Sequence, residues 1–330
     1  MRIASVVGTR PQLIKAAVLQ PLLRARHDEI FIDTGQHYDD ALAGAFIDEL
    51  GLVRPDRSLG IGAGTATEQT AAMLERLGPV LADTRPDVVI VYGDTNSTLA
   101  GSIAAAQLGL PLAHVEAGLR SFDRAMPEEN NRLIADHLGT WLFAPTPTAL
   151  ANLAAEGLAR ASCLVGDLMQ DLAARLGPTV RDPSILAQIG TRLGLPPPGL
   201  RPGGYLLATV HRAENRYPAA LSAWAGMLEA VATVERPVLL VLHPGTAAAL
   251  AEAGIELAPM IRVVPPQGYR TTLALQLHAA AVLTDSGWVQ REAAWLGVPC
   301  LVLRNTTEWL EAVDESAGRM LVIGLDPDRA

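Results

Sequence analysis

The sequence predicts a two-domain α/β protein in which each domain is a doubly wound parallel sheet covered by helices. Three observations carry this prediction. The chain has 330 residues, more than one hydrophobic core usually sustains. Short apolar runs alternate with longer helical patterns almost throughout, as in strand–helix–strand units. The apolar runs are nearly continuous, which is typical of parallel strands buried on both faces.

In the first half of the chain, five short apolar runs are expected to be strands. They are RIASVV (2–7), EIFIDT (29–34), VVIVY (88–92), LAHVE (112–116) and WLFAP (141–145). Helical patterns between them cover 11–25, 68–83 and 97–107. The alternation predicts parallel strands joined by helical crossovers.

The second half repeats the pattern. The expected strands are YLLATV (205–210), VLLVL (238–242), IRVV (261–264), AVLTD (281–285) and CLVL (300–303), and the expected helices cover 219–232, 270–280 and 288–296. Between the two series lies 166–200, which leads into the proline-rich LGLPPPGLRPGG. The sequence therefore predicts one domain over 1–167 and a second over 168–330.

Composition narrows the class of function. Hydrophobic residues make up 49% of the chain and aromatic residues only 4%, so the core is expected to consist of Ala, Leu, Val and Ile. A net charge of −9 argues against a general binder of nucleic acid or of membrane surfaces. It does not exclude an anionic ligand, because a few local cations can outweigh the global field.

Cysteine usage and the N-terminal segment predict a cytoplasmic location. Cys163 and Cys300 are far apart and lack metal-binding spacing, so both are expected to be small buried residues in a reducing compartment. The segment MRIASVVGTR holds too short an apolar run for a secretory signal. The uncharged stretch 95–115 is interrupted by polar residues and Pro, so no transmembrane helix is expected.

Ligands of doubly wound sheets bind beyond the carboxyl ends of the strands, so the cleft between the domains is the expected site. After the first strand, Arg10 and Lys15 place two cations at a helix start that suits a phosphate. Asp94 follows a later strand, where it either faces the ligand or caps the next helix.

The run HVEAGLRSFDRAMPEENNR carries the densest charge. Glu116 ends a strand, and Glu128 and Arg132 follow on the next helix. An i,i+4 pair is the simplest explanation of Glu128 and Arg132, but it does not explain Glu116. Three successive loops bring a carboxylate or a cation to the same side of the sheet, which favours a ligand site.

Strand ends in the second half also carry candidate ligand-binding residues. His211 and His243 each follow a strand, although a lone histidine is more often a structural hydrogen-bonding residue. Ser286 and Gly287 precede a helix whose amide groups can bind a phosphate. Glu292, further along that helix, is placed either to bind a ribose diol or to form a surface pair with Arg291.

Taken in order, the strand-end motifs resemble the non-hydrolysing UDP-N-acetylglucosamine 2-epimerases over nearly the whole chain. The motifs are GTRPQLIK, TGQH, GDTNST, HVEAGLRS, PEENNR, FAPT, HRAEN, HPG, LTDSG and the pair LR and TE within 303–308. The resemblance implies the glycosyltransferase B-type fold with two Rossmann-like domains, a homodimer, and a UDP-sugar substrate. It implies C2 epimerisation by elimination and re-addition of UDP through a 2-acetamidoglucal, without cofactor or metal.

The resemblance also implies residue roles. Asp94, Glu116 and Glu128 belong to the sugar site with His211 beside them; Arg10, Lys15, Arg132, His243, Ser286, Gly287 and Glu292 bind the UDP part. Gln36, His37 and Gln69 are the possible remnants of a regulatory UDP-sugar site, which Tyr38 and Asp39 after TGQH put in doubt.

The chain departs from the family pattern in three places. Trp288 replaces a glycine, Arg291 replaces a glutamate, and TEWLE (307–311) stands for TERPE. The sequence ends at LDPDRA, where relatives continue with helices and an NPYGDG-like motif, so domain closure is the property expected to be most affected.

Three alternatives follow from these features. GTRPQ, TGQHYDD and TEW are similar to the branch that acts on UDP-2,3-diacetamido-2,3-dideoxyglucuronate, which is the main competing substrate. A glycosyltransferase on the same scaffold is a second alternative, and an inactive UDP-sugar binder a third. The lack of a metal-ligand cluster and of a GxGxxG after a strand argues against a redox route.

Overall fold

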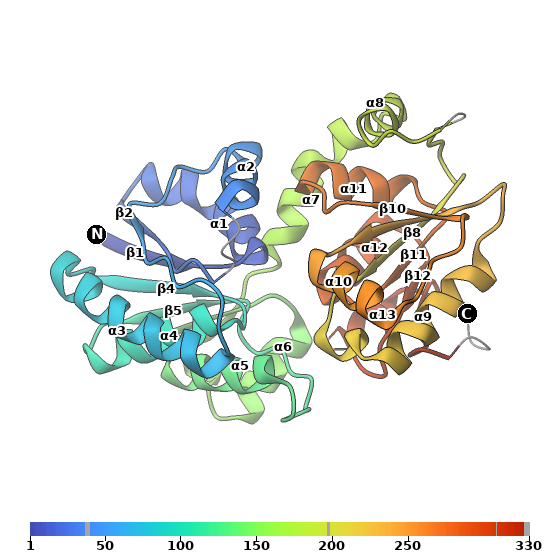
Figure 1. Ribbon diagram of the computed structural model, residues 1–330. Helices are drawn as coiled ribbons and strands as arrows, with labels where there is room; N and C mark the ends of the chain where they lie inside the picture. Colours follow the sequence, from blue (N-terminus) through green and yellow to red (C-terminus); the bar gives the residue numbers. More distant parts are fainter. Residues whose placement is uncertain (37–39, 197–198, 308, 327–330) are drawn as a thin grey trace. The chain divides into compact units, whose positions relative to one another are not determined.

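The computed structural model describes residues 1–36, 40–196, 199–307 and 309–326. The chain forms two compact units, unit 1 (Met1–Leu172) and unit 2 (Ala173–Ala330). The division falls inside the helix α7 (Leu168–Val180). Each unit is built around its own parallel sheet, as Figure 1 shows.

Unit 1 holds a seven-stranded sheet in the order β3-β2-β1-β4-β5-β6-β7, with every neighbouring pair parallel. The strands are β1 (Arg2–Val7), β2 (Asp28–Asp33), β3 (Arg57–Ser58), β4 (Val88–Tyr92), β5 (Leu112–Val115), β6 (Trp141–Ala144) and β7 (Ser162–Leu164). The helices are α1 (Arg10–Arg24), α2 (Asp40–Leu50), α3 (Ala66–Thr84), α4 (Asn96–Gln107), α5 (Pro127–Leu138) and α6 (Pro147–Ala155), with a 3-10 turn η1 (Ala159–Ala161).

Both faces of this sheet are covered, and β1 shows how. Ile3 and Val7 pack with Leu13 and other residues of α1 on one face. Ala4 and Val6, whose side chains alternate with them, pack with Met73 and other residues of α3 and α4 on the opposite face. Two buried faces require continuous apolar strands, which is the pattern that the sequence carries.

Unit 2 holds a six-stranded parallel sheet in the order β10-β9-β8-β11-β12-β13. The strands are β8 (Leu206–Val210), β9 (Val238–Leu242), β10 (Ile261–Val264), β11 (Ala281–Thr284), β12 (Cys300–Val302) and β13 (Met320–Val322). The helices are α8 (Ser184–Arg192), α9 (Pro218–Val231), α10 (Pro244–Ala253), α11 (Tyr269–His278), α12 (Gly287–Leu296) and α13 (Leu310–Glu315), with a 3-10 turn η2 (Ala213–Arg216).

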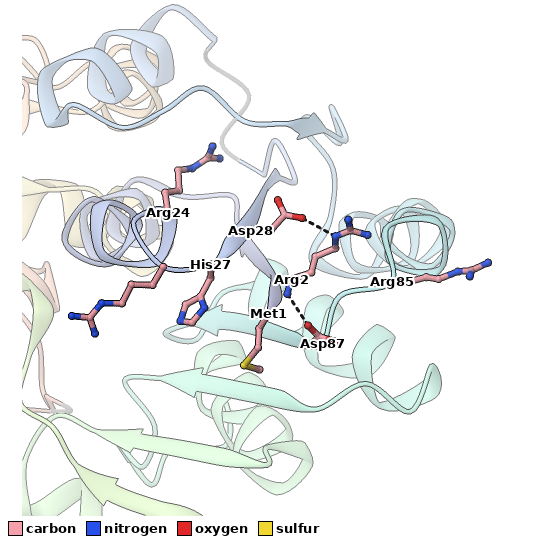
Figure 2. A pocket seen from close by; sticks show the side chains of 8 residues that line it. Met1, Arg2, Arg24, His27, Asp28, Arg85 and Asp87 are labelled. Carbon is pink, nitrogen blue, oxygen red and sulfur yellow. Dashed lines mark hydrogen bonds and ion pairs between the residues drawn. The ribbon is translucent and has the colours of Figure 1, made fainter.

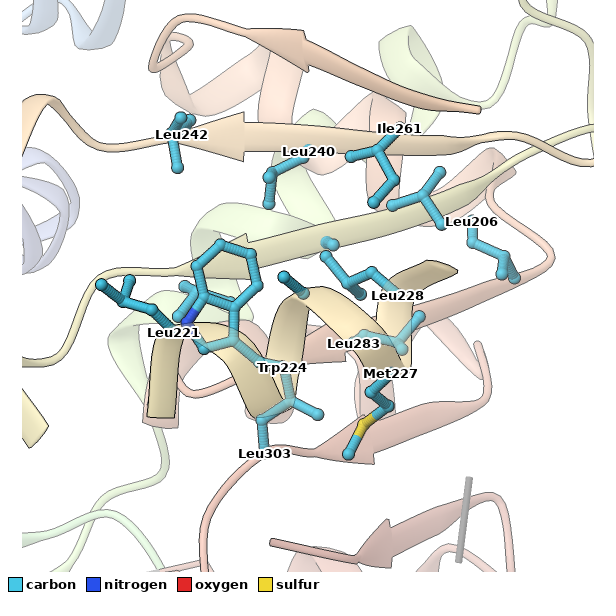
Figure 3. Packing of buried hydrophobic residues seen from close by; sticks show 14 of the residues in the cluster. Leu206, Leu221, Trp224, Met227, Leu228, Leu240, Leu242, Ile261, Leu283 and Leu303 are labelled. Carbon is cyan, nitrogen blue, oxygen red and sulfur yellow. The ribbon is translucent and has the colours of Figure 1, made fainter. Parts of the chain in front are cut away.

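The core of unit 2 centres on Trp224 of α9, which is fully buried (Figure 3). Its ring packs among leucines of α9 and of the sheet, including Leu221 and Leu240. Its indole Nε1 donates to the carbonyl of Asn215, 3.1 Å away. The single polar atom of this large side chain is therefore satisfied, and the same contact ties α9 to the η2 turn.

The ten predicted strands are all present, so the predicted fold class is confirmed. The expectation that Cys163 is buried was wrong: it is exposed, whereas Cys300 is buried. Cys163 lies in β7, an edge strand whose other residues are also exposed or half-buried. In the part of the chain that the structure describes, every helix is too short or too polar to span a bilayer.

Candidate active site

In both units the strand order reverses between two central strands, β1 and β4 in unit 1 and β8 and β11 in unit 2. Helices leave on opposite sides of the sheet at such a point, which opens a crevice at the carboxyl ends. The loops that follow these strands, together with the helices after them, carry Arg10, Lys15, Asp94, His211, Ser286, Gly287 and Glu292. The sheet geometry therefore brings together side chains that are far apart in sequence.

The loop after β1 is locked to the loop after β4 by Gln12. Its Oε1 accepts hydrogen bonds from the backbone N–H groups of Gly8 (2.8 Å) and Thr9 (3.1 Å). Its Nε2 donates to the carbonyl of Tyr92 (2.8 Å) and to the hydroxyl of Thr98 (3.0 Å). Gln12 is buried and was not singled out from the sequence, because a glutamine in a first helical turn has no distinctive spacing.

Gly8 is required by close packing at this loop. A Cβ atom there would lie 2.0 Å from Oγ1 of Thr34 and 2.3 Å from Oγ of Ser97. The loop therefore passes directly against its neighbours. Arg10, the next predicted site residue, has its guanidinium 5.8 Å from the ring centroid of Phe46 in α2.

Lys15 and Glu116 form a buried ion pair. The Lys15 Nζ lies 2.7 Å from Oε2 of Glu116, and the two side chains are only 6% and 11% exposed. Glu116 adopts a left-handed backbone with φ of 72°, a strained conformation for a residue with a side chain. Strain of this kind at a strand end is typical of functional sites, and here it directs a carboxylate to a lysine on a neighbouring helix.

The surroundings of Glu116 raise the pKa of its carboxyl group. Burial raises the pKa of this carboxyl; Lys15 acts against that, whereas the nearby carboxylates of Asp167 and Asp94 raise it further. The net result is a raised pKa. A carboxyl group poised in this way is suited to proton transfer or to the stabilisation of a developing positive charge.

Asp94 is held by Arg132 of α5. The Nε and Nη2 atoms of Arg132 both donate to Oδ2 of Asp94, at 3.0 and 2.7 Å, and Nη1 donates to Glu129 at 2.8 Å. Asn131 donates to the backbone carbonyl of Asp94 at 2.9 Å. Arg132 is buried, whereas the Asp94 side chain is 25% exposed, so its carboxylate remains accessible to a ligand.

Glu129 connects this pair to the loop after β5. Its carboxylate accepts from the backbone N–H groups of Ser121 (2.8 Å) and Phe122 (3.1 Å) and from the Ser121 hydroxyl. Glu128, the predicted catalytic residue beside it, is half-buried in the first turn of α5. Its carboxylate makes no hydrogen bond or ion pair with any residue that the structure describes, so it is available for other contacts.

Two of the predicted regulatory remnants, Gln36 and Gln69, contact the start of α4. Oε1 of Gln36 accepts from the backbone N–H (3.0 Å) and hydroxyl (2.8 Å) of Ser97. Gln69 accepts from Asn96 at 3.1 Å and donates to the carbonyl of Gly62 at 2.9 Å. His37 lies outside the described residues. Both glutamines therefore support the helix that follows Asp94.

In unit 2, the His211 ring contacts a buried carboxylate. Its Nδ1 lies 2.9 Å from Oδ1 of Asp285, which is fully buried and also accepts from the backbone N–H groups of His211 and Arg212 and from Asn215. Burial opposes ionisation of Asp285, but its hydrogen bond and charge interaction with His211, then the other donors, lower its pKa to about 2. The imidazole is 44% exposed and oriented through Nδ1, which leaves Nε2 for a ligand.

The start of α12 is the predicted phosphate site. Ser286 is the N-cap residue and Gly287 the first residue of the helix. The backbone N–H of Ser286 donates to the Thr284 hydroxyl at 3.0 Å, which fixes the entry into the helix. His243 caps α10 in a similar position, where its Nδ1 accepts from the N–H of Gly245 at 3.2 Å.

Glu292 is fully buried, so the alternative of a surface carboxylate was wrong. Its Oε2 accepts a hydrogen bond from Nε2 of Gln276 in α11. Residues of α12 are buried around most of its circumference, so a surface position does not follow from a charged residue type alone. Trp288 stacks on Tyr269 with ring centroids 6.1 Å apart.

A shallow depression of about 670 Å³ lies elsewhere in unit 1, at the amino ends of β1 and β2 (Figure 2). Arg2, Arg24, Arg26 and Arg85 line it, and Arg2 is paired with Asp28 at 2.9 Å. It contains no predicted site residue and lies at the opposite end of the strands. Among the residues described, no group of His, Cys, Asp and Glu side chains is arranged to bind a metal.

Comparison with known proteins identifies the family. A family model described as UDP-N-acetylglucosamine 2-epimerase matches residues 22–329. The UDP-2,3-diacetamido-2,3-dideoxy-D-glucuronate 2-epimerase of Pseudomonas aeruginosa is 39% identical over 334 residues, covering 99% of this chain and 90% of that protein.

Solved structures of the same family are also similar to this chain. The UDP-GlcNAc 2-epimerase of Methanocaldococcus jannaschii, in complex with UDP-GlcNAc and UDP, is similar with a TM-score of 0.90 at 36% identity, over 100% of this chain and 90% of that chain. The glycosyltransferase SnogD from Streptomyces nogalater is similar in fold alone, with a TM-score of 0.56 at 17% identity over 99% and 86%, in keeping with the glycosyltransferase B-type fold. This chain belongs to the UDP-N-acetylglucosamine 2-epimerase family.

Proposed function

We propose that the protein interconverts UDP-N-acetylglucosamine and UDP-N-acetylmannosamine by non-hydrolysing epimerisation at C2. The observation that carries this proposal is the pairing of two carboxylates with two buried cations beyond the central strands of unit 1. Glu116 forms an ion pair with Lys15, and Asp94 forms an ion pair with Arg132. Such a site combines proton acceptors with positive charge, and the reaction requires both.

The chemistry explains this requirement. C2 of an N-acetylhexosamine has no adjacent carbonyl, so its proton is not acidic enough for simple enolisation. In the proposed route a carboxylate takes the C2 proton while the C1–O bond breaks and its electron pair leaves with UDP. The product is a 2-acetamidoglucal with a C1–C2 double bond. UDP then adds back to C1, and a proton is delivered to the opposite face of C2.

We propose the following roles for the residues of unit 1. Asp94 and Glu128 are the proposed pair for proton transfer at C2, because the first is accessible and held in place and the second is free to move a proton. Glu116 stabilises positive charge that develops at C1. Arg10, Lys15 and Arg132 supply the positive charge that a departing diphosphate needs.

Unit 2 is proposed to bind the UDP part. The N-terminus of α12, with Ser286 and Gly287, offers backbone N–H groups to the phosphates. Glu292 accepts hydrogen bonds from the ribose hydroxyls, and His211 and His243 contact the diphosphate side of the sugar. Support comes from the fixed orientation of the His211 ring on Asp285.

Proton NMR with UDP-N-acetylglucosamine in heavy water tests the proposal. We expect the anomeric signal of the manno product, with deuterium at C2. Asp94→Asn and Glu128→Gln should each lower turnover by ~10²–10⁴-fold while circular dichroism remains unchanged. Full activity in both variants would overturn the assignment of the pair.

UDP-2,3-diacetamido-2,3-dideoxyglucuronate is the second candidate substrate. The 39% identity to the Pseudomonas aeruginosa enzyme favours it, as does the Trp309 of TEWLE. The same heavy-water experiment with this nucleotide sugar distinguishes the two. Conversion of only the diacetamido-uronate would assign the chain to that branch, and transfer of sugar to an acceptor would instead identify a glycosyltransferase.

We further propose a homodimer in the cytoplasm, where nucleotide sugars are made. Light scattering and cell fractionation check these two statements. We also propose that Gln36, His37 and Gln69 retain part of a regulatory UDP-sugar site. A second binding event in calorimetric titration with UDP-N-acetylglucosamine, lost in Gln69→Ala, would support it, and a single event would contradict it.

A further inference from the structure

A fully buried histidine lies directly beneath the loop that carries Asp94. His114, in β5, is 0% exposed. Its Nδ1 lies 2.7 Å from Oδ1 of Asp136 in α5, and its Nε2 lies 2.7 Å from the backbone carbonyl oxygen of Gly93. Both ring nitrogens are therefore within short hydrogen-bond distance of an oxygen atom.

The carbonyl oxygen of Gly93 can only accept a hydrogen bond, and the same holds for the carboxylate of Asp136 when it is ionised. A carbonyl oxygen has no proton, so Nε2 of His114 must donate to Gly93. Asp136 is fully buried, and its Oδ2 accepts from Nη2 of Arg120 at 2.7 Å and from the N–H of Gly118 at 3.1 Å. Burial opposes its ionisation, but the charges and hydrogen bonds of His114 and Arg120 leave its pKa lowered.

An ionised Asp136 requires a proton on Nδ1 as well. Either neutral tautomer of His114 would point a lone pair at an acceptor 2.7 Å away, in a site with no room for water to intervene. The charges also balance, because Arg120 forms a bidentate pair with Glu156, with both contacts at 2.7 Å. Two cations and two carboxylates then make a neutral cluster, in which only the Glu156 side chain is partly exposed, at 25%.

The cluster fixes the peptide that precedes Asp94. The N–H of Gly93 donates to the carbonyl of Val115 at 2.9 Å, and its carbonyl accepts from His114. Gly93 has φ of 63°, so the chain turns sharply there before Asp94. With both polar groups of this peptide bound to β5, the turn has little freedom to move.

We propose that His114 is a doubly protonated positioning residue: clamped by Asp136, its imidazolium holds the Gly93 carbonyl and thereby orients Asp94 for proton transfer. This inference rests on the proposed function for the role of Asp94. The protonation state of His114 does not depend on it. The two statements can therefore be tested separately.

Long-range proton–nitrogen NMR on protein with labelled histidine tests the protonation state directly. The chain has seven histidines, and His114→Gln identifies the signals of His114. We expect both ring nitrogens to be protonated at the pH of the kinetic assay. A neutral tautomer at that pH would overturn the proposal, whatever the protein catalyses.

Kinetics on the wild-type protein and two matched variants tests the positioning role. His114→Gln keeps a donor for Gly93 but loses the charge that Asp136 requires; we expect kcat to fall about 10- to 100-fold with KM within about twofold. Glu156→Gln removes one charge from the same cluster without touching His114, and its kcat should stay within about threefold of wild type. An unchanged kcat in His114→Gln, or an equal loss in both variants, would overturn the positioning role.

Discussion

Asp285 is expected to stabilise unit 2 through its charge, and its replacement by asparagine tests this. The carboxylate is fully buried and accepts four hydrogen bonds or ion-pair contacts from His211, Arg212 and Asn215. Asp285→Asn keeps the size of the side chain and removes the charge. It also replaces one carboxylate oxygen, which accepts hydrogen bonds, by an amide N–H₂ that would face hydrogen-bond donors.

The magnitude follows from the lowered pKa. Asp285 has a pKa of about 2, against 3.8 for an ordinary aspartate. Each tenfold change in proton affinity corresponds to about 1.4 kcal/mol, so the ionised form stabilises the fold by about 2.5 kcal/mol. Because the folded-state pKa is depressed, this contribution is fully present above about pH 4.5 and is lost as the pH falls toward 2.

Urea unfolding followed by tryptophan fluorescence measures the effect. Four of the five tryptophans lie in unit 2, at positions 224, 288, 295 and 309. Asp285→Asn should lower the free energy of unfolding by about 2–3 kcal/mol between pH 5 and 7, and the difference should shrink below pH 4.

Glu252→Gln, an exposed carboxylate of the same unit, is the control and should change stability by less than about 0.5 kcal/mol. The reasoning would be refuted by a loss for Asp285→Asn as small as that of the control. A difference that stayed constant down to pH 2.5 would equally show that the charge of Asp285 is not the cause.

Two further predictions concern the ligand contacts. Lys15→Met leaves Glu116 buried without its cation, so the free energy of unfolding should fall by about 3–5 kcal/mol. Adding Glu116→Gln to this variant should restore stability without restoring turnover; thermal unfolding measures the stability, and the NMR assay measures the turnover. Glu292→Gln should weaken UDP binding about 10- to 100-fold in calorimetric titration, and equal affinity would remove Glu292 from the ribose site.

The fold was predictable because strands buried on both faces appear in the sequence as continuous apolar runs. The strand β4 reads VVIVY and is buried at every position. The edge strands β3 and β7 have two and three residues and no buried position. A run that short, without apolar residues on both faces, gives no recognisable strand pattern in the sequence. Cys163 is exposed for the same reason, because it lies in the short edge strand β7.

The sequence predicted which residue types follow the strands but not how those residues pair. Helix spacing suggested a pair between Glu128 and Arg132, whereas the structure pairs Arg132 with Asp94 and Glu129. Spacing along one helix reveals only neighbours three or four residues apart. The contact with Asp94 crosses from α5 to the end of β4, and it exists only because the sheet order places β4 beside β5.

Arg291 and Trp309 are two separate departures from the family pattern in the sequence, but in the structure their side chains are in contact. The Arg291 guanidinium lies 4.7 Å from the ring centroid of Trp309 and 5.3 Å from that of Trp295. The two residues thus form a cation–π contact at a buried position. Because position 291 adjoins Glu292, this contact lies next to the proposed ribose ligand in α12.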